Sequence, residues 1–540
     1  MSKLWRGIGL VGLVAVAAYF AYDYQRASGG AQAPATAANF SGLRILAGSE
    51  LKDIEFLRER MESAAGVKIR FDYIGTLDMV DRLSGAGTGT GAADAPDLVW
   101  AASNKYLSLA APGKVRATEK IMLSPVVLGV KAGKLRALGW DKAAPTWADV
   151  SLAVKQGQLS FAMSNPAASN SGFAAVVGVA AALAGKGDGL TQADIDPAKL
   201  REFFAGVKLT AGSSGWLADA YVGAEDRLDG MVNYESVILS LNAANKLREA
   251  LVPVYPQEGI ITADYPLMLI NEARRAQYDK LVAFLREEGV QREIMEHSFR
   301  RPVNPAVKPL PVFGTRLLVE LPFPGQLAVV DAILTSYLDD ARPPAHSYFV
   351  LDVSGSMGGE QRMDHLKSAL GVLGGGDTAT LGGRFSRFQL REKANLITFD
   401  DRLQEHAEIA FGDRASYPGS VGRFQDFVGH LRPKGGTAIY DALEAAYRRA
   451  AADRAAEPGY YYTIVLMTDG ENNAGADFKR FSQFYQALAP EVRQIRIFPI
   501  LFGEGNAGEM KALADLTGGR VFDAKSASLT AVFKDIRGYQ

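Results

Sequence analysis

The sequence predicts an α/β protein in which two α/β regions follow a short hydrophobic segment at the N-terminus. Apolar runs of strand length alternate with amphipathic stretches from residue 40 to the C-terminus, which is typical of parallel sheets flanked by helices. A proline-rich interval at residues 306–345 divides the chain. With 540 residues and a hydrophobic share of 48%, the chain is long enough for two or more packed domains.

Composition excludes several classes of protein. The net charge is -1, so the chain lacks the basic surface that nucleic-acid binding requires. Cysteine is absent, which excludes disulfide bonds, thiolate chemistry and a cysteine-linked lipid anchor. These facts leave the cellular compartment open, and the N-terminal segment bears on that question.

Residues 1–26 contain an apolar run at 7–22, which is near the lower length limit for crossing a bilayer. Two basic residues precede the run, so the rest of the chain is expected on the periplasmic or extracellular side of a bacterial-type cell membrane. The segment is either an uncleaved single-pass anchor or a signal peptide cut near residues 31–33. Aromatic residues at the end of the run favour the anchor, and residues 27–39 read as a flexible tether.

Residues 40–305 alternate short strands with helices. A strand and turn are expected at 43–48, further strands at 67–74, 97–100 and 159–163, and helices at 51–65, 78–84 and 173–184. This order predicts a sheet with helical crossovers. It resembles the periplasmic solute-binding protein family in its type II arrangement, in which crossing strands join two lobes. The resemblance implies that this region is a solute sensor or a scaffold.

Polar residues mark the starts of two expected helices in this region, one at Ser49 and one at the end of the run 164–171. Helix N-termini attract anions, and the resemblance implies a small oxyanion or carboxylate held between the lobes. The candidate ligand-binding residues are Ser49, Ser164, Ser169, Asn170, Ser171, Tyr234 and Tyr265. Ordinary helix capping is the alternative, and Glu50 and Glu235 would repel an anion if they pointed inward.

Residues 306–345 form a predicted linker because prolines recur throughout the interval. Helical spacing at 325–338 predicts a short helix inside it that docks one domain on the other. The last domain is expected to span 346–540. Its further strands are predicted at 395–399, 495–502 and 521–523, with a helix at 507–517 and a glycine-rich loop at 373–383.

Oxygen-bearing side chains follow two apolar strands of this last domain. The strand at 348–351 runs into Asp352, Ser354 and Ser356, and the strand at 460–467 runs into Asp469. Thr437 stands just before a helix expected at 438–451. Because carboxyl ends of parallel strands share one edge of a sheet, these side chains are expected to converge there. Carboxylate and hydroxyl oxygens are the donors that Mg²⁺ prefers.

This pattern looks like the metal-ion-dependent adhesion site of von Willebrand factor A domains, which have a doubly wound, Rossmann-like fold. The matching positions are Asp352, Ser354, Ser356, Thr437 and Asp469. The resemblance implies that the two serines and the threonine bind the metal directly, with the aspartates holding water and hydroxyl groups behind them. Mg²⁺ is expected, with Ca²⁺ or Mn²⁺ as alternatives. Helix capping by the serines is the competing interpretation.

Two functions follow from the sequence, and neither is catalytic. In the first, a membrane-anchored adhesion or assembly protein binds a partner protein, whose carboxylate completes the metal shell. In the second, an extracytoplasmic receptor or transport-associated protein binds a solute. The five histidines lie in no zinc-like pair or triad motif, and no phosphate-binding loop occurs, so an enzyme is not expected.

Overall fold

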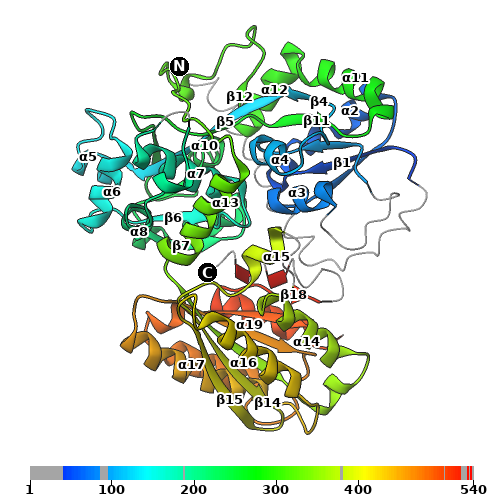
Figure 1. Cartoon of the computed structure of the whole chain (residues 1–540), viewed down its shortest axis with the longest axis vertical. Coiled ribbons are helices and arrows are strands. Elements are labelled where there is room, and N and C mark those ends of the chain that lie inside the picture. Colours follow the sequence, from blue (N-terminus) through cyan, green and yellow to red (C-terminus); the bar gives the residue numbers. More distant parts are fainter. Residues whose placement is uncertain are drawn as a thin grey trace. The chain divides into compact units, whose positions relative to one another are not determined.

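The structure is a computed structural model that describes residues 40–85, 95–186, 189–376, 381–503, 505–524, 532–533 and 536–537. The predicted membrane segment 1–26 and tether 27–39 lie outside these residues. Among the helices that are described, none combines the length and the hydrophobicity needed to cross a bilayer. The chain divides into two compact units, the first ending at Tyr337 and the second beginning at Leu338 (Figure 1).

The first lobe of the first unit is a five-stranded mixed sheet in the order β2-β1-β3-β11-β4. The strands β1, β2 and β3 are parallel, and β11 runs antiparallel to both of its neighbours. The strand bounds are β1 Leu43–Ala47, β2 Ile69–Tyr73, β3 Leu98–Trp100, β4 Ala117–Lys120 and β11 Pro266–Leu269. The helices are α2 Arg58–Ala65, α3 Thr76–Ser84, α4 Lys105–Ala110, α11 Arg275–Leu285 and α12 Glu288–Ser298.

One predicted helix of this lobe differs in form. The interval expected to be a helix at 51–65 begins as a 3₁₀-helix, η2, at Ser49–Leu57, and becomes α-helical only at Arg58. Leu51, Ile54 and Leu57 recur every third residue and are all buried, which matches the three-residue period of a 3₁₀-helix.

The second lobe is also a mixed sheet, in the order β10-β5-β8-β6-β7, with β9 and β12 paired to the long strand β5. The strands are β5 Met122–Lys131, β6 Phe161–Ser164, β7 Val207–Ala211, β8 Gly230–Tyr234, β9 Leu251–Val254, β10 Thr262–Ala263 and β12 Arg301–Pro302. The helices are α5 Ala132–Ala137, α6 Trp147–Lys155, α7 Asn170–Ala184, α8 Pro197–Phe204, α9 Ser214–Ala224 and α10 Glu235–Ala243. The chain passes between the lobes at β4–β5, at β10–β11 and at α12–β12, which confirms the predicted two-lobed α/β fold.

The proline-rich interval is largely packed on the first unit. Its predicted helix is present as α13, Leu327–Ser336, and contacts α7. Upstream, Phe313 is buried with Val307 against Leu239 and Met295. The prolines interrupt regular structure, but apolar side chains between them hold the segment on the surface of the lobes.

The second unit is a six-stranded sheet in the order β15-β14-β13-β16-β17-β18. All neighbouring strands are parallel except β14 and β15. The strands are β13 Ala345–Asp352, β14 Glu392–Phe399, β15 Leu403–Phe411, β16 Tyr461–Thr468, β17 Arg496–Leu501 and β18 Phe522–Asp523. This mostly parallel sheet confirms the predicted α/β class, and it places β13 between β14 and β16.

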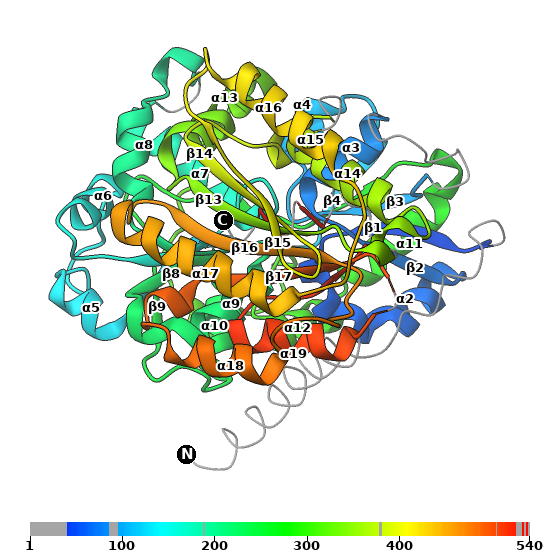
Figure 2. The same ribbon diagram turned by 90° about the horizontal axis from the view of Figure 1, so that it is seen from below.

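Helices cover both faces of this sheet (Figure 2). On one side lie α14 Arg362–Leu373, α15 Leu381–Ser386 and α16 Tyr417–His430, and on the other α17 Ile439–Ala456, α18 Phe478–Ala487 and α19 Ala507–Thr517. The second group packs on Tyr348 and Val350 of β13. The predicted loop at 373–383 is only partly a loop, since α14 ends at Leu373 and α15 begins at Leu381.

Candidate metal centre and solute site

Asp352, the last residue of β13, is fixed by the loops around it. Its Oδ1 accepts a hydrogen bond of 2.8 Å from the Ser354 amide, and its Oδ2 accepts one of 2.6 Å from the Thr468 hydroxyl. The Ser354 and Ser356 hydroxyl oxygens lie 3.0 Å apart. Burial raises the pKa of Asp352 to about 6, although the bonds from Ser354 and Thr468 act in the opposite direction.

Backbone hydrogen bonds bring the threonine loop to the serine loop. The Gly355 amide donates to the Gly435 carbonyl at 3.0 Å, and the Lys434 amide donates to the Val353 carbonyl at 2.7 Å. Gly435 has a φ of +72°, a backbone conformation that glycine adopts at little cost. The loop that follows β13 and the loop that precedes α17 are therefore tied together at the carboxyl edge of the sheet.

A third loop, which follows β16, joins them. The amide of Thr437 donates to Asn473 Oδ1 at 2.8 Å, and the Asn473 amide returns a bond of 3.0 Å to the Thr437 carbonyl. Asp469 begins this loop. The structure thus gathers the loops that carry all five candidate residues. Among those five residues, direct hydrogen bonds join only Asp352 to Ser354 and Ser354 to Ser356.

Asp469 carries the feature that bears most directly on metal binding. Its side chain is buried, and within the described part of the chain its Oδ1 has no hydrogen-bond partner. Its Oδ2 accepts a bond of 3.1 Å from Nη1 of Arg362. A buried carboxylate oxygen without a partner is costly unless a cation or water meets it. The surrounding donors are all oxygens, so the residues present fit a hard divalent ion.

Arg362 was not predicted as a site residue; it lies ten residues beyond Asp352 at the start of α14. Its Nη1 also donates to the Ser356 carbonyl at 3.2 Å, and its Nη2 pairs with Glu360 at 3.0 Å. No motif links this arginine to the site, because Arg362 belongs to α14 and meets Asp469 only through the fold. A basic residue placed soon after the serines was the available signal.

A second group of potential metal ligands lies at the opposite end of β13. His346, Glu408 and Asp453 each offer one donor atom, and these atoms all lie within 4.8 Å of one another. His346 is buried, Asp453 is half-buried and Glu408 is exposed. They come from β13, β15 and α17, so sequence spacing gave no indication of the group.

In the first unit, the candidate serines form a buried cluster of hydroxyl groups. Ser171 lies 2.7 Å from Ser164 and 2.8 Å from Ser214, oxygen to oxygen, and Ser169 lies 3.2 Å from Ser171. Ser214 was not predicted. It starts α9, as Asn170 starts α7, so the N-terminal ends of two helices meet at these hydroxyls.

Two candidate tyrosines lie together beside the helix start. Asn170 Nδ2 donates to the Tyr234 hydroxyl at 3.0 Å, and the rings of Tyr234 and Tyr265 are 6.1 Å apart. The Tyr265 hydroxyl is buried and has no hydrogen-bond partner among the described residues. The guanidinium of Arg300 lies 4.7 Å from the centre of the Tyr265 ring. Burial raises the pKa of both phenols above their ordinary value.

Arg300 and its partners were not predicted either. The guanidinium is almost fully buried and donates to both carboxylate oxygens of Asp53, at 2.8 and 2.7 Å, and to the Glu50 carbonyl at 2.9 Å. Ser49 neighbours this group but makes no hydrogen bond to the serine cluster in the described structure. Glu235 was expected to repel an anion if it pointed inward. Arg301 neutralises it through two bonds of 2.7 Å.

Comparison with known proteins identifies both regions. The model of the bacterial extracellular solute-binding protein family matches residues 43–300, and that of the von Willebrand factor type A domain matches residues 348–535. Both are binding families rather than catalytic ones. A search of curated proteins finds no match to this chain.

Solved structures resemble the chain at low sequence identity. The ferric binding protein from Campylobacter jejuni is 14% identical, covers 54% of this chain and 95% of its own, and has a TM-score of 0.38. The periplasmic binding protein AfuA from Actinobacillus pleuropneumoniae is 13% identical over 56% of this chain and 98% of its own, with a TM-score of 0.40. The apo ferric ion-binding protein A from Pasteurella haemolytica is 14% identical over 55% and 96%, with a TM-score of 0.38.

The two family matches fall in succession along the chain, one within each compact unit. The chain therefore consists of a bacterial extracellular solute-binding domain followed by a C-terminal von Willebrand factor type A domain.

Proposed function

We propose that this protein is a membrane-anchored extracytoplasmic binding protein that engages a partner protein through Mg²⁺ held in its A domain. Ser354, Ser356 and Thr437 would bind the ion directly, while Asp352 and Asp469 would hold its water ligands. The unpartnered, buried Oδ1 of Asp469 carries this proposal, because it lies on one of three loops that hydrogen bonds bring together. The solute-binding domain would serve as sensor or scaffold.

Charge explains why such a site binds proteins. Three hydroxyl ligands leave most of the charge of a divalent ion unbalanced, and Arg362 adds a further positive charge beside Asp469. A carboxylate from a partner would complete the coordination shell and neutralise the excess. The three hydroxyl ligands supply no general base, in keeping with a role in binding.

Calorimetric titration of Mg²⁺ into the wild type and into Thr437→Ala tests the proposed metal site. We expect the variant to lose about tenfold or more in affinity and to unfold at nearly the wild-type temperature, because a single hydroxyl ligand is removed. Thr437→Ser is the matched control, since it keeps the hydroxyl. Equal Mg²⁺ affinity in wild type and Thr437→Ala would overturn the assignment.

Partner binding is tested separately. Capture of proteins from a membrane fraction, with Mg²⁺ and then with a chelator, should identify partners that release on chelation. The same partners should be missing from Thr437→Ala and present with Thr437→Ser. A partner that Thr437→Ala retains, and that does not release on chelation, contradicts binding through the metal.

A solute receptor is the second candidate function. The buried, unpartnered hydroxyl of Tyr265 next to Tyr234 and Asn170 favours it, because a bound solute would satisfy that group. A small anion is the proposed ligand class, with the serine hydroxyls and two helix starts as donors. Thermal unfolding in the presence of a panel of oxyanions and carboxylates tests it, and a solute that raises the unfolding temperature would support it.

The domain layout completes the proposal. We place the anchor at 1–26, the tether at 27–39, the solute-binding domain at 40–305, a linker at 306–345 and the A domain at 346–540. The sheet order of the first lobe supports the type II arrangement. Protein that partitions into the membrane only when residues 1–26 are present would support the anchor, and a shortened mature N-terminus would instead indicate cleavage.

A further inference from the structure

We propose that His346, Glu408 and Asp453 form a second metal site in the A domain, one that takes a transition-metal ion of the Zn²⁺ class. The site lies at the amino end of β13, whereas the candidate Mg²⁺ centre lies at the carboxyl end. It does not rest on the proposed function, because it shares no residue with the first centre.

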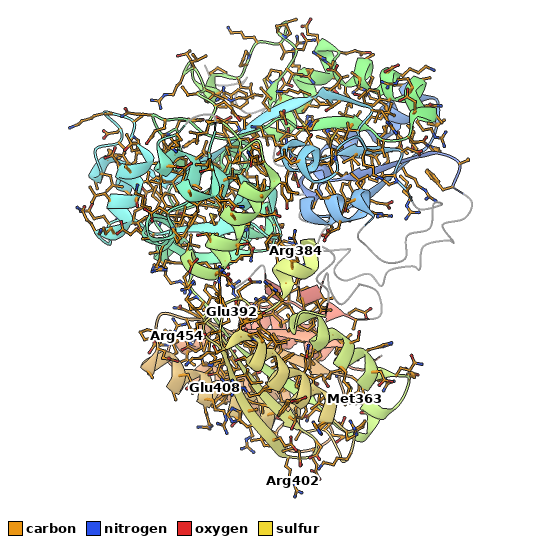
Figure 3. All side chains as sticks on the ribbon, viewed as in Figure 1. Met363, Arg384, Glu392, Arg402, Glu408 and Arg454 are labelled. Atoms are coloured by element: carbon orange, nitrogen blue, oxygen red, sulfur yellow. The ribbon has the colours of Figure 1, made fainter. Side chains whose placement is uncertain are left out.

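The geometry suits a metal ion of this class. His346 Nε2 and Asp453 Oδ2 are 4.0 Å apart. A tetrahedral ion about 2.0 Å from an imidazole nitrogen and about 2.1 Å from a carboxylate oxygen holds those atoms roughly 3.4 Å apart, so the Asp453 carboxylate has to move about 0.6 Å closer to His346. Glu408 projects from the edge strand β15 and is exposed, so its carboxylate can move the short distance needed to complete the shell (Figure 3).

The three residues share one face of the sheet. His346 and Tyr348 alternate along β13, and Asn395 of β14 lies directly between Tyr348 and Glu408 in the strand register. The helix α17 covers this face, and Asp453 lies in its last turn. The C-terminal end of a helix carries partial negative charge, so the backbone itself favours a cation at this place.

His346 is a deeply buried imidazole whose hydrogen-bonding capacity is only partly used. The ring is about 1% exposed and is enclosed by Tyr348, Tyr460 and Tyr462, with ring centres 5.1 to 5.6 Å away. Its Nδ1 has no hydrogen-bond partner among the described residues, whereas its Nε2, the nitrogen 4.0 Å from Asp453, lies 2.7 Å from the side-chain amide of Asn395. A nitrogen donor combined with two carboxylates favours a transition metal over Mg²⁺, which prefers oxygen ligands alone.

Three contacts must change when the ion binds. The Tyr348 hydroxyl donates to Asp453 Oδ2, the oxygen that faces His346, and must release it or share it with the ion. Asn395 must turn from His346 Nε2, although its carbonyl oxygen is held by His406 Nε2 at 2.6 Å. Lys393 lies 3.8 Å from Glu408 and must release it, while it keeps its closer partner Glu457 at 2.6 Å. The ammonium group of Lys393 is therefore a built-in competitor for the ion, and its removal should strengthen binding.

Calorimetric titration of Zn²⁺ into the tag-free full-length protein, with excess Mg²⁺ present, tests the proposal. We expect one equivalent to bind, with at least about tenfold weaker affinity in Glu408→Gln and Asp453→Asn. Lys393→Gln should bind several-fold more tightly. Glu405→Gln, an equal change of charge on the same strand, should leave the affinity unchanged.

Substitution with Co²⁺ gives an independent readout. Co²⁺ bound to the wild type should give visible absorption bands. In His346→Gln, which lacks the imidazole ligand, these bands should be absent. His346 is buried, so its variant can fail to fold. Glu408 is exposed, so Glu408→Gln should fold normally and its Zn²⁺ affinity still tests the site. Absence of Zn²⁺ binding in the wild type, or binding unchanged in both carboxylate variants, would overturn the second site. Asp352→Asn should retain Zn²⁺, which separates this result from any failure of the Mg²⁺ centre.

Discussion

Arg362 Nη1 donates to Asp469 Oδ2 at 3.1 Å. A positively charged side chain is therefore already hydrogen-bonded to one of the two aspartates of the candidate Mg²⁺ centre. The arginine side chain is about one-fifth exposed, which leaves the interaction partly screened. It neutralises Asp469 and opposes a divalent ion nearby. Arg362 therefore has the position of a residue that sets how tightly the metal is held.

We expect Arg362→Gln to bind Mg²⁺ more tightly than the wild type, by about threefold to tenfold, because a competing positive charge is removed. Calorimetric titration at low ionic strength measures the change, and added salt should reduce it. Arg454→Gln, in the C-terminal turn of α17, is the control and should leave the affinity unchanged. Weaker binding in Arg362→Gln would mean that the arginine positions the loop rather than competing with the ion.

Chelation should destabilise the A domain. A ligand present at one hundred times its dissociation constant stabilises the native state by about 2.7 kcal/mol. We therefore expect the unfolding temperature of the second unit to fall when EDTA removes Mg²⁺, with the first unit unaffected. In Asp469→Asn the same chelation should have little effect. If that variant responds as strongly as the wild type, the ion binds elsewhere.

The buried carboxylate of Glu392 should make the stability of the second unit depend on pH. Burial disfavours its charged form, but Arg537 and Arg342 outweigh that effect and hold its pKa below the ordinary value of 4.5. The carboxylate accepts a bond of 2.7 Å from Arg537 and a second bond from Arg342. Because the pKa of Glu392 is lower in the folded than in the unfolded protein, its ionised form stabilises the fold at pH values above about 4.5, the pKa in the unfolded chain. This stabilisation is lost as the pH falls through the pKa of the folded protein.

We expect Glu392→Gln to lower the free energy of unfolding by about 3 kcal/mol near neutral pH, because two buried arginines lose their counter-charge. The difference from wild type should shrink below about pH 4. Denaturant unfolding at several pH values measures it, with the exposed Glu491→Gln as control. If the difference in unfolding free energy between wild type and Glu392→Gln stays constant down to pH 3, the ion pairs of Glu392 with Arg342 and Arg537 are not its cause.

Strand and helix patterns along the chain were sufficient to predict two α/β regions, and the resemblance to type II solute-binding proteins supplied the two lobes of the first. The motif that begins at Asp352 and continues through Ser354 and Ser356 could be recognised because its spacing is local. Arg362, Arg300 and His346 act through contacts made across the sheet or between lobes, and nothing in their immediate neighbours marks them. The antiparallel edge strand β15 was missed because its exposed side chains hide the period of a half-buried strand.

Gly172 tests the packing that forms the serine cluster. A Cβ at this position would lie 2.0 Å from the carbonyl oxygen of Ser164, so only glycine allows α7 to approach β6 this closely. We expect Gly172→Ala to lower the free energy of unfolding of the first unit by about 1–3 kcal/mol. Gly289→Ala in α12, where no atom lies within 4 Å, is the matched control and should be neutral or stabilising. If Gly172→Ala is as stable as the wild type, the start of α7 can move to make room for the added methyl group.

Tyr265 and Tyr234 lie together but differ in hydrogen bonding, so substitution can distinguish a ligand-binding tyrosine from a structural one. Because the buried Tyr265 hydroxyl has no partner in the described structure, Tyr265→Phe should leave the solute-free protein as stable as the wild type, or up to about 1 kcal/mol more stable. Tyr234→Phe should be destabilising, since its hydroxyl accepts the bond from Asn170. If a solute binds here, Tyr265→Phe should also reduce the rise in unfolding temperature that the solute causes. A clear loss of stability in Tyr265→Phe without solute would instead assign the hydroxyl a role in folding.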